Sequence, residues 1–248
     1  MPKIETLLLR CKDPQAQVRF YCDHLGMTEF DDGSVGYGGE QAKFRFIQTD
    51  GVYEPQRNDV YWKIALAVPN IELAYKQLVA KGIDVGQPRQ FKEIGYLAHF
   101  CDPEGFTIEL IEHWFLGNRQ DDVIDPELLG GGAHFNLLTL RTADIAPVNE
   151  ACLSWGMTPL SIQPVEDYNF TLYFYAFTSD TPPSSDLQAV DNREWLYQRQ
   201  YTVLEVQHLL QDSEVRQPKE TEPGYAGMVI SGLADSTDDA GLIVRASA

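Results

Sequence analysis

Four charged residues each stand between apolar neighbours in short strand-like runs of the sequence. They are Arg45, Lys63, Glu109 and Glu205. Successive side chains of a β-strand point to opposite faces, so the apolar neighbours would pack into a core while the charged group points away from it. Cations and carboxylates gathered on one sheet face can pair as ions, hold a metal, or stabilise charge on an oxygenated ligand. We therefore expect these side chains to face a cavity.

The run around Lys63 shows how the two faces divide. By strand alternation, Trp62, Ile64 and Leu66 share one face, whereas Lys63 and Ala65 share the other. The first set predicts the face that packs into the core, and the second predicts the face that lines the cavity.

The strands that carry these residues recur in a repeated unit. The sequence of residues 9–13 returns in altered form at 140–144, and that of 26–28 returns at 156–158. Two matches in the same order and at nearly the same separation indicate an internal duplication. The repeated unit is a strand, a helix, and then two or three further strands.

Helix signals stand at the same place in each copy. Asp13, Asn70 and Asp144 are good N-cap residues, because their side chains accept hydrogen bonds from the first free amides of a helix. The copies, which we call modules one to three, start near residues 4, 60 and 134. A fourth module starts near residue 224, with too little sequence after it for a complete unit.

The segment 117–133 is rich in acids and contains three consecutive glycines, which is typical of a linker. It divides the chain into two expected domains. Residues 1–116 would hold modules one and two, and residues 134–248 would hold module three and the incomplete fourth module.

Composition limits the classes of partner. With 37 acidic against 19 basic residues the formal net charge is −18, which argues against nucleic-acid and anionic-membrane surfaces. No apolar run is long enough for a membrane helix, and the N-terminus lacks a signal-peptide pattern. The four cysteines lack metal-ligand spacing and fit a reducing compartment. We expect a cytoplasmic protein that binds a small molecule, and the incomplete module leaves a sheet edge open for a homodimer.

Longer sequence motifs in the modules resemble those of the vicinal oxygen chelate superfamily, which includes glyoxalase I, bleomycin-resistance proteins and extradiol dioxygenases. The most specific motif is an Asp-Pro-Glu-Gly turn at 102–105 followed by Ile-Glu-Leu-Ile at 108–111. The segment 202–208, with Trp195 and Arg199 before it, is similar to eukaryotic-type glyoxalase I in particular. The resemblance implies an α+β fold of paired βαβββ modules, in two tandem domains with the last module incomplete, whose curved sheets enclose a cavity.

The resemblance also implies a divalent metal, Zn, Ni, Fe or Mn, held by one residue from each of four strands. By this resemblance Glu109 and Glu205 keep the glutamate positions. The other positions hold residues that are not the family's ligands: Thr6, Arg45, Lys63, Leu137 and Gly227. A zinc ion takes about four ligands drawn from Cys, His and carboxylate, so the sequence predicts a degenerate metal site.

Two pairings of the modules give two different sites, and the sequence leaves both open. If module one faces module two, Arg45 and Lys63 would pair with Glu109 in the place of a metal. If module three faces module two, Glu109 and Glu205 would share one cavity. They could then hold a metal only if Lys63 moved away, and otherwise Lys63 bridges the two carboxylates.

Catalytic roles follow from the resemblance and from charge. Glu109 matches the glutamate that serves the family as ligand and base, moving a proton between adjacent carbons. Lys63 or Arg45 could stabilise an oxyanion without a metal.

The expected substrate cavity contains two arginines from equivalent strands. Arg141 matches the glutathione-binding arginine of the family, and Arg10 is its counterpart in module one. Strand alternation adds His99, which precedes the Asp-Pro-Glu-Gly turn. The remaining expected cavity residues are Thr6 and Glu205.

Three functions stay open at this point. The first is an enzyme that resembles lactoylglutathione lyase and acts on a small oxygenated metabolite. The second is a non-catalytic protein of the same fold that binds such a ligand in a cavity without a metal. The third is a scaffold. The degenerate ligand set favours the second function, because the family's reaction requires a metal. The shared fold does not by itself argue for the first, since one fold can serve several functions.

Overall fold

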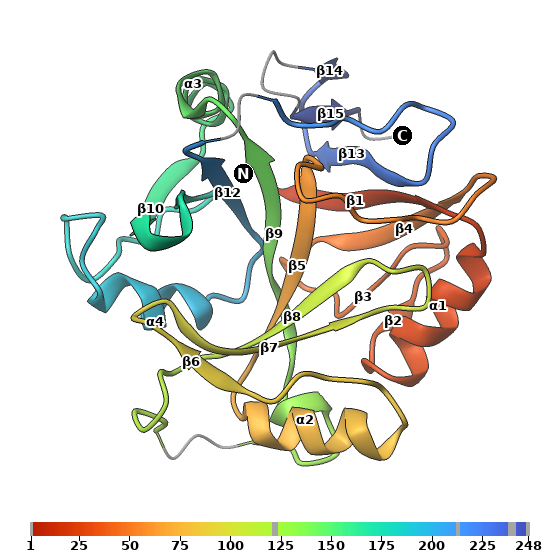
Figure 1. Ribbon diagram of the computed structural model, residues 1–248, viewed down its shortest axis with the longest axis horizontal. Helices are drawn as coiled ribbons and strands as arrows, with labels where there is room; N and C mark the ends of the chain where they lie inside the picture. The colour runs from red at the N-terminus through yellow and green to blue at the C-terminus, as the bar shows by residue number, and fades with distance from the viewer. Residues whose placement is uncertain (1, 121–123, 212–213, 238–241, 247–248) are drawn as a thin grey trace.

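The computed structural model of the protein describes residues 2–120, 124–211, 214–237 and 242–246. Two curled sheets form its frame, and the helices lie around their periphery (Figure 1). None of the helices in these ranges combines the length and the apolar character that crossing a bilayer requires.

The eight-stranded sheet contains modules two and three, with its strands in the order β10-β11-β12-β9-β5-β8-β7-β6. Module two supplies β5 (Tyr61–Val68), α2 (Ile71–Ala80), β6 (Arg89–Phe91), β7 (Gly95–Cys101) and β8 (Thr107–Glu112). Module three supplies β9 (His134–Thr142), α3 (Ile145–Ser154), β10 (Thr158–Val165), β11 (Phe170–Ala176), α4 (Asp191–Tyr197) and β12 (Val203–Leu209). Two short 3-10 turns, η1 (Leu129–Gly131) and η2 (Glu166–Tyr168), lie between these elements.

The seven-stranded sheet contains modules one and four, in the order β14-β15-β13-β1-β4-β3-β2. Module one supplies β1 (Ile4–Cys11), α1 (Pro14–Asp23), β2 (Thr28–Glu29), β3 (Val35–Gly36) and β4 (Lys43–Gln48). The described part of module four supplies β13 (Gly224–Ile230), β14 (Ser236–Thr237) and β15 (Ile243–Arg245).

The modules pair across the middle of the chain. β5 runs antiparallel to β9, and β1 runs antiparallel to β13, so module two pairs with module three and module one with module four. The α+β class and the paired modules are thus confirmed, and the second of the two pairings left open by the sequence is the one present. Each sheet takes strands from both sides of 117–133 (Figure 1). Tandem domains at 1–116 and 134–248 stay a prediction.

The helix starts follow the cap signals. Asp13, Asn70 and Asp144 each accept a hydrogen bond of 2.9 Å from a backbone amide in the first turn of α1, α2 and α3. These caps satisfy amides that have no partner within the helix, which fixes where each module turns from its first strand into its helix.

The main core lies between the two sheets. Ile64 and Leu66 of β5 belong to one buried apolar cluster with Leu7 of β1, and Phe44 of β4 stacks on Phe135 of β9 with 4.5 Å between ring centroids. The opposite face of β5 belongs to a second, smaller cluster. The eight-stranded sheet therefore has one face in the core and another that lines a separate space.

Candidate functional site

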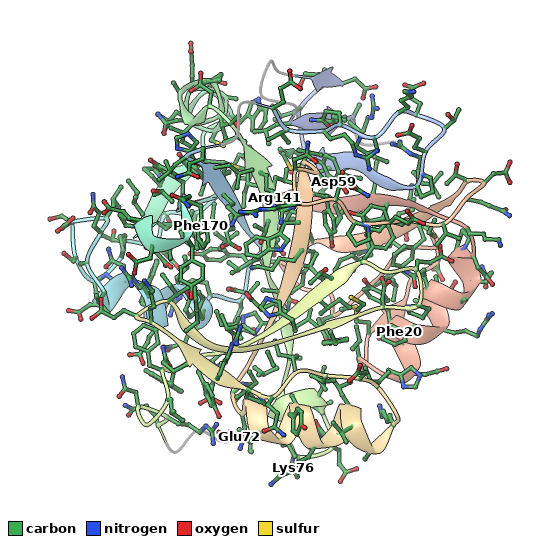
Figure 2. All side chains as sticks on the ribbon, in the orientation of Figure 1. Phe20, Asp59, Glu72, Lys76, Arg141 and Phe170 are labelled. Carbon is green, nitrogen blue, oxygen red and sulfur yellow. The ribbon has the colours of Figure 1, made fainter. Side chains whose placement is uncertain are left out.

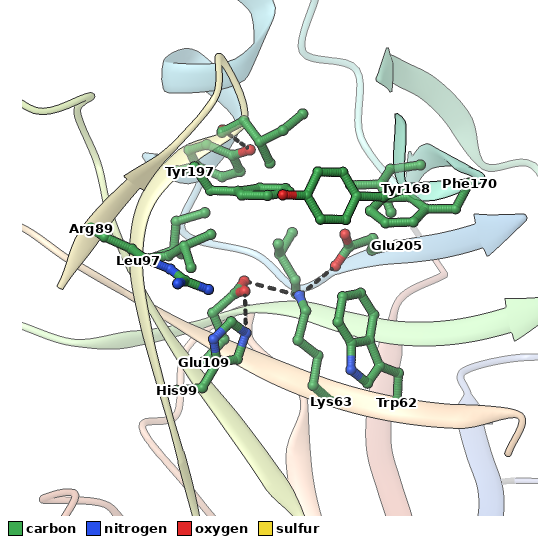
Figure 3. Close-up of a pocket in the computed structure, with 15 residues that line it drawn as sticks. Trp62, Lys63, Arg89, Leu97, His99, Glu109, Tyr168, Phe170, Tyr197 and Glu205 are labelled. Atoms are coloured by element: carbon green, nitrogen blue, oxygen red, sulfur yellow. Dashed lines mark hydrogen bonds and ion pairs between the residues drawn. The ribbon is translucent and has the colours of Figure 1, made fainter. Parts of the chain in front are cut away.

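Three charged side chains meet on the second face of the eight-stranded sheet. The Lys63 ammonium lies 2.9 Å from Glu109 Oε1 and 2.9 Å from Glu205 Oε2, and it donates a third hydrogen bond, of 3.2 Å, to Thr139 Oγ1. The Thr139 hydroxyl in turn donates to Glu205. The side chains of Lys63, Glu109 and Glu205 are 3%, 5% and 3% exposed. Figure 3 shows the ammonium between the two carboxylates.

Strand register explains how residues so far apart in sequence come together. β5 lies between β8 and β9, and β12 lies on the far side of β9. Lys63 is opposite Thr139, and Thr139 is opposite Glu205, so these three form one row across the sheet. Glu109 is opposite Ala65, two residues along β5 from Lys63 and on the same face.

The charges of this group hold one another in the ionised state. Burial alone would lower the pKa of Lys63, but the two carboxylates outweigh it and raise that pKa above its ordinary value. Burial alone would raise the pKa of Glu109, yet Lys63 and His99 lower it to about 2. At neutral pH Lys63 therefore keeps its proton and Glu109 is ionised.

His99 extends the group toward solvent. It stands on β7 opposite Glu109 of β8, and its Nε2 lies 2.9 Å from Glu109 Oε2. Its side chain is 37% exposed, against 5% for that of Glu109. The expectation that His99 faces the cavity agrees with its position in the lining.

These residues form the floor and one wall of a cavity of about 220 Å³. Most of the remaining lining is apolar or aromatic. It consists of Trp62, Phe91, Ile94, Leu97, Ile111, Leu137, Tyr168, Phe170, Leu172 and Tyr197, with Arg89 as a further charged residue. Such a concave, mostly apolar space with a few polar groups is the usual form of a small-ligand site.

The donor set does not fit a divalent metal while Lys63 keeps this position. A metal shared by Glu109 and Glu205 would have to lie between their oxygens, where the ammonium now lies. In the described ranges no group of three or more His, Cys, Asp and Glu side chains is placed to hold a metal ion. A cation is present in the site, but it belongs to the chain itself.

Arg45, Thr6 and Arg10 do not join this group, because all three belong to the seven-stranded sheet. Arg45 pairs with Asp32 at 3.2 Å and is partly exposed. Thr6 lies half-buried on β1. The Arg10 guanidinium donates to backbone carbonyls of the segment before β13, including that of Glu222 at 2.8 Å. The module pairing separates these three from Lys63.

Arg141 lies behind the cavity wall rather than in the cavity lining. Its Nε donates to Gln207 Oε1 at 2.9 Å, and its guanidinium carbon lies 5.1 Å from the centre of the Trp62 ring. Figure 2 places Arg141 close to Asp59, whose backbone carbonyl accepts a hydrogen bond from it at 3.3 Å. Arg141 therefore supports the wall through Trp62.

One prediction about the faces of β5 is wrong. Alternation placed Trp62 on the core face with Ile64, but Trp62 lines the cavity beside Lys63. The pairing of β5 with β9 contains a register shift between Tyr61 and Lys63, and such an irregularity lets neighbouring residues share a side.

Sequence reasoning also missed Arg89 and Tyr168. Arg89 stands on the short edge strand β6, and Tyr168 ends the turn η2. Periodicity gives no signal in elements this short. The aromatic run at 168–175 was the available clue that an aromatic wall was present.

Comparison with known proteins agrees with this architecture. Residues 3–110 match the family described as the Glyoxalase/Bleomycin resistance protein/Dioxygenase superfamily, which confirms the resemblance found in the sequence. Among curated proteins, none matches the sequence.

Several solved structures share the fold at low sequence identity. Glyoxalase I from Zea mays is 19% identical with a TM-score of 0.64, over 93% of this chain and 74% of that one. A glyoxalase I mutant from Zea mays is 17% identical with a TM-score of 0.68, over 99% and 92% of the two chains. A putative dioxygenase from Bacillus subtilis is 14% identical with a TM-score of 0.55, over 96% and 71%. At these identities the likeness extends to the fold alone.

Proposed function

We propose that this glyoxalase-family protein binds a small oxygenated metabolite in the cavity between modules two and three, and that its metal site is degenerate. The observation that carries the proposal is the Lys63 ammonium, which lies 2.9 Å from a carboxylate oxygen of both Glu109 and Glu205. It supplies, from the chain itself, the positive charge that the two buried carboxylates require.

The hydrogen bonds of Lys63 argue for a binding role rather than catalysis by this group. A lysine ammonium has three N–H donors, and here Glu109, Glu205 and Thr139 accept all three. No donor remains for an oxyanion unless the group rearranges. The pKa of Glu109, lowered to about 2, also makes its carboxylate a weak base, because an efficient general base has a pKa near the working pH.

One contact favours a second candidate, a metal-free enzyme that transfers a proton through His99. A carboxylate beside an imidazole orients the ring, and Glu109 Oε2 stands 2.9 Å from His99 Nε2. The imidazole reaches the cavity and is open to solvent. This candidate needs a ligand whose acidic proton lies against His99, whereas binding alone needs no such alignment.

The four cysteines indicate the cellular compartment in which the protein works. In the part of the chain that the structure describes, none of the four forms a disulfide, and Cys11 and Cys152 are buried. Thiols stay reduced in a reducing compartment, so we place the protein in the cytoplasm. A homodimer stays a prediction.

The test is metal content. The full chain would be incubated with Zn²⁺, Ni²⁺, Fe²⁺ and Mn²⁺, freed of excess ion, and analysed for bound metal. We expect far less than one ion per chain for the wild type. The variant Lys63→His removes the ammonium and offers an imidazole beside the two carboxylates, so it should gain bound metal. Lys76→His is the matched control, because Lys76 is exposed on α2 at the periphery of the molecule (Figure 2) and is not part of the cavity lining.

Two results would count against the proposal. A wild-type chain that retains about one metal ion would show that Lys63 yields its position. A Lys63→His variant that gains no more metal than Lys76→His would show that the two carboxylates are not placed as metal ligands at all.

A further inference from the structure

The charges on the cavity floor are already paired. Lys63 lies between Glu109 and Glu205, and His99 contacts Glu109. A charged ligand gains little from groups that would first have to give up these partners, because breaking a buried pair leaves an uncompensated charge. The floor therefore offers a charged ligand no unpaired partner.

Arg89 is the lining charge that remains available. It is exposed, and in the part of the chain that the structure describes its guanidinium makes no ion pair or hydrogen bond. It stands opposite Leu97 on the edge of the sheet, and Figure 3 shows its guanidinium extending into the cavity, above His99 in this view. A guanidinium presents a planar fork of N–H donors that matches a carboxylate.

Aromatic side chains form much of the rest of the wall. They are Trp62, Phe91, Tyr168, Phe170 and Tyr197. Phe91 and Tyr168 meet edge to face with 5.1 Å between ring centroids, and Trp62 meets Phe170 at 6.5 Å. Rings arranged in this way favour a further aromatic ring in an offset or edge-to-face contact.

Aromatic rings also attract cations, but two lysine side chains of the protein already contact rings of this wall. Lys63 Nζ lies 4.8 Å from the Trp62 ring centre, and Lys92 Nζ lies 5.2 Å from that of Tyr168. A cationic ligand would compete with these ammonium groups for the rings and would meet the like charge of Arg89. An anionic ligand meets an unpaired partner instead.

The size of the cavity limits the ligand further. An apolar cavity of about 150 Å³ holds benzene. The volume of about 220 Å³ leaves room for one ring and a short chain. The short chain of the ligand must be long enough for its charged end to contact Arg89 at the edge of the sheet.

We infer that the ligand of this cavity is a small aromatic monocarboxylate, an arylalkanoate, whose carboxylate binds the Arg89 guanidinium while its ring lies among the aromatic side chains. The inference rests on the proposed function, since it takes the cavity as the binding site. It names Arg89 as the residue that determines specificity for the anion.

The experiment titrates the full chain by calorimetry with three ligands of one shape: 3-phenylpropionate, its neutral amide and 3-phenylpropylamine. We expect the acid to bind at least about tenfold more tightly than the amide, the range for a hydrogen bond to a charged group. Arg89→Gln should remove that preference, so that the acid and the amide bind with similar affinity. Arg57→Gln, a change at another exposed arginine outside the cavity lining, should behave as the wild type.

Other outcomes overturn the inference. Acid and amide that bind equally would leave the cavity as a binding site without selection for an anion. A preference for the amine would make the wall a cation site. A preference for the acid that survives Arg89→Gln would place the carboxylate elsewhere. If none of the three binds, the arylalkanoate is excluded, and the proposed function is then judged by metal content alone.

Discussion

Lys63 is the one cation that serves two buried carboxylates in the described floor of the cavity. Its ion pairs with Glu109 and Glu205 are both 2.9 Å long, and all three side chains are nearly inaccessible to water. Carboxylates in such a place are stable as anions only beside a cation, because burial penalises an unpaired charge. Alternation in the sequence placed all three on one face, and the structure brings them together.

Lys63→Met should therefore destabilise the protein strongly. The methionine fills a similar volume but leaves Glu109 and Glu205 without a counter-charge, and breaking a buried pair in this way costs about 3–5 kcal/mol. The free energy of unfolding in urea measures the loss. Adding Glu109→Gln and Glu205→Gln to the same chain removes the two charges and should restore most of the stability. If Lys63→Met alone unfolds at the same urea concentration as the wild type, the group of Lys63, Glu109 and Glu205 is solvated or already neutral.

At the scale of elements, the join between modules two and three contains a buried histidine. His134 begins β9, is 1% exposed, and lies 5.3 Å from His113, ring centre to ring centre. Burial, with a smaller contribution from His113, lowers the pKa of His134 from 6.5 to about 3. The folded state therefore holds this imidazole neutral at a pH where an unfolded chain would protonate it.

This shift predicts a specific loss of stability in mild acid. The folded pKa lies below the unfolded one, so the stabilisation is complete above pH 6.5 and declines as the pH falls toward 3. One group of this kind contributes a slope of about 1.4 kcal/mol per pH unit within that window. His134→Gln should reduce the slope between pH 6.5 and 4.5 by about that amount, measured by urea unfolding at each pH. His24→Gln, at the partly exposed end of α1, should keep it, and an unchanged slope in His134→Gln would contradict the assignment.

An ion pair joins two loops whose neighbouring residues, Phe91 and Tyr168, line the cavity. Lys92, which follows β6 with φ of 47°, forms an ion pair with Asp167 in η2, and Asn169 just beyond has φ of 59°. These two are the non-glycine residues with positive φ in the described ranges. Such backbone conformations are costly for most side chains and persist where the surroundings hold them.

Removing this contact should loosen the cavity wall at Phe91 and Tyr168 with little effect on stability. Lys92 and Asp167 are 42% and 79% exposed, and an exposed ion pair contributes about 1 kcal/mol at most. We expect Lys92→Ala to increase the quenching of Trp62 fluorescence by acrylamide, in a background where the other three tryptophans are phenylalanine. Lys76→Ala on α2 serves as control. Equal quenching in the two variants would show that the ion pair does not restrict access to the cavity.

The positions of helices and strands could be predicted from the sequence better than the pairing of the modules. The caps Asp13, Asn70 and Asp144 mark where helices start, because a cap acts within one turn of the chain. The pairing of the modules was not predictable in this way. The first strands of modules one and three are alike in sequence, so either could lie beside β5, and only contacts between distant segments distinguish them. The residues contributed by short edges and turns, Arg89 and Tyr168, carry no periodic signal.

At the scale of the whole molecule, the two sheets interlock the halves of the chain. β5 and β9 meet in the middle of one sheet, and β1 and β13 meet in the other. A fragment that ends before residue 117 would keep β5 and β1 but lose both of these antiparallel neighbours. Each central strand would then become an edge, with unpaired backbone groups and an apolar face open to water.

This arrangement predicts that the halves depend on each other. Fragments 1–116 and 134–248, produced separately, should each lack a cooperative thermal transition by circular dichroism, and an equimolar mixture should regain one. The full chain cleaved within 117–133, at an inserted protease site, is the control, because it keeps every strand and should stay associated on size exclusion. A monomeric fragment 1–116 with its own cooperative transition would contradict this expectation. It would also establish the first half as a domain, since cooperative unfolding of a small monomer requires a core of its own.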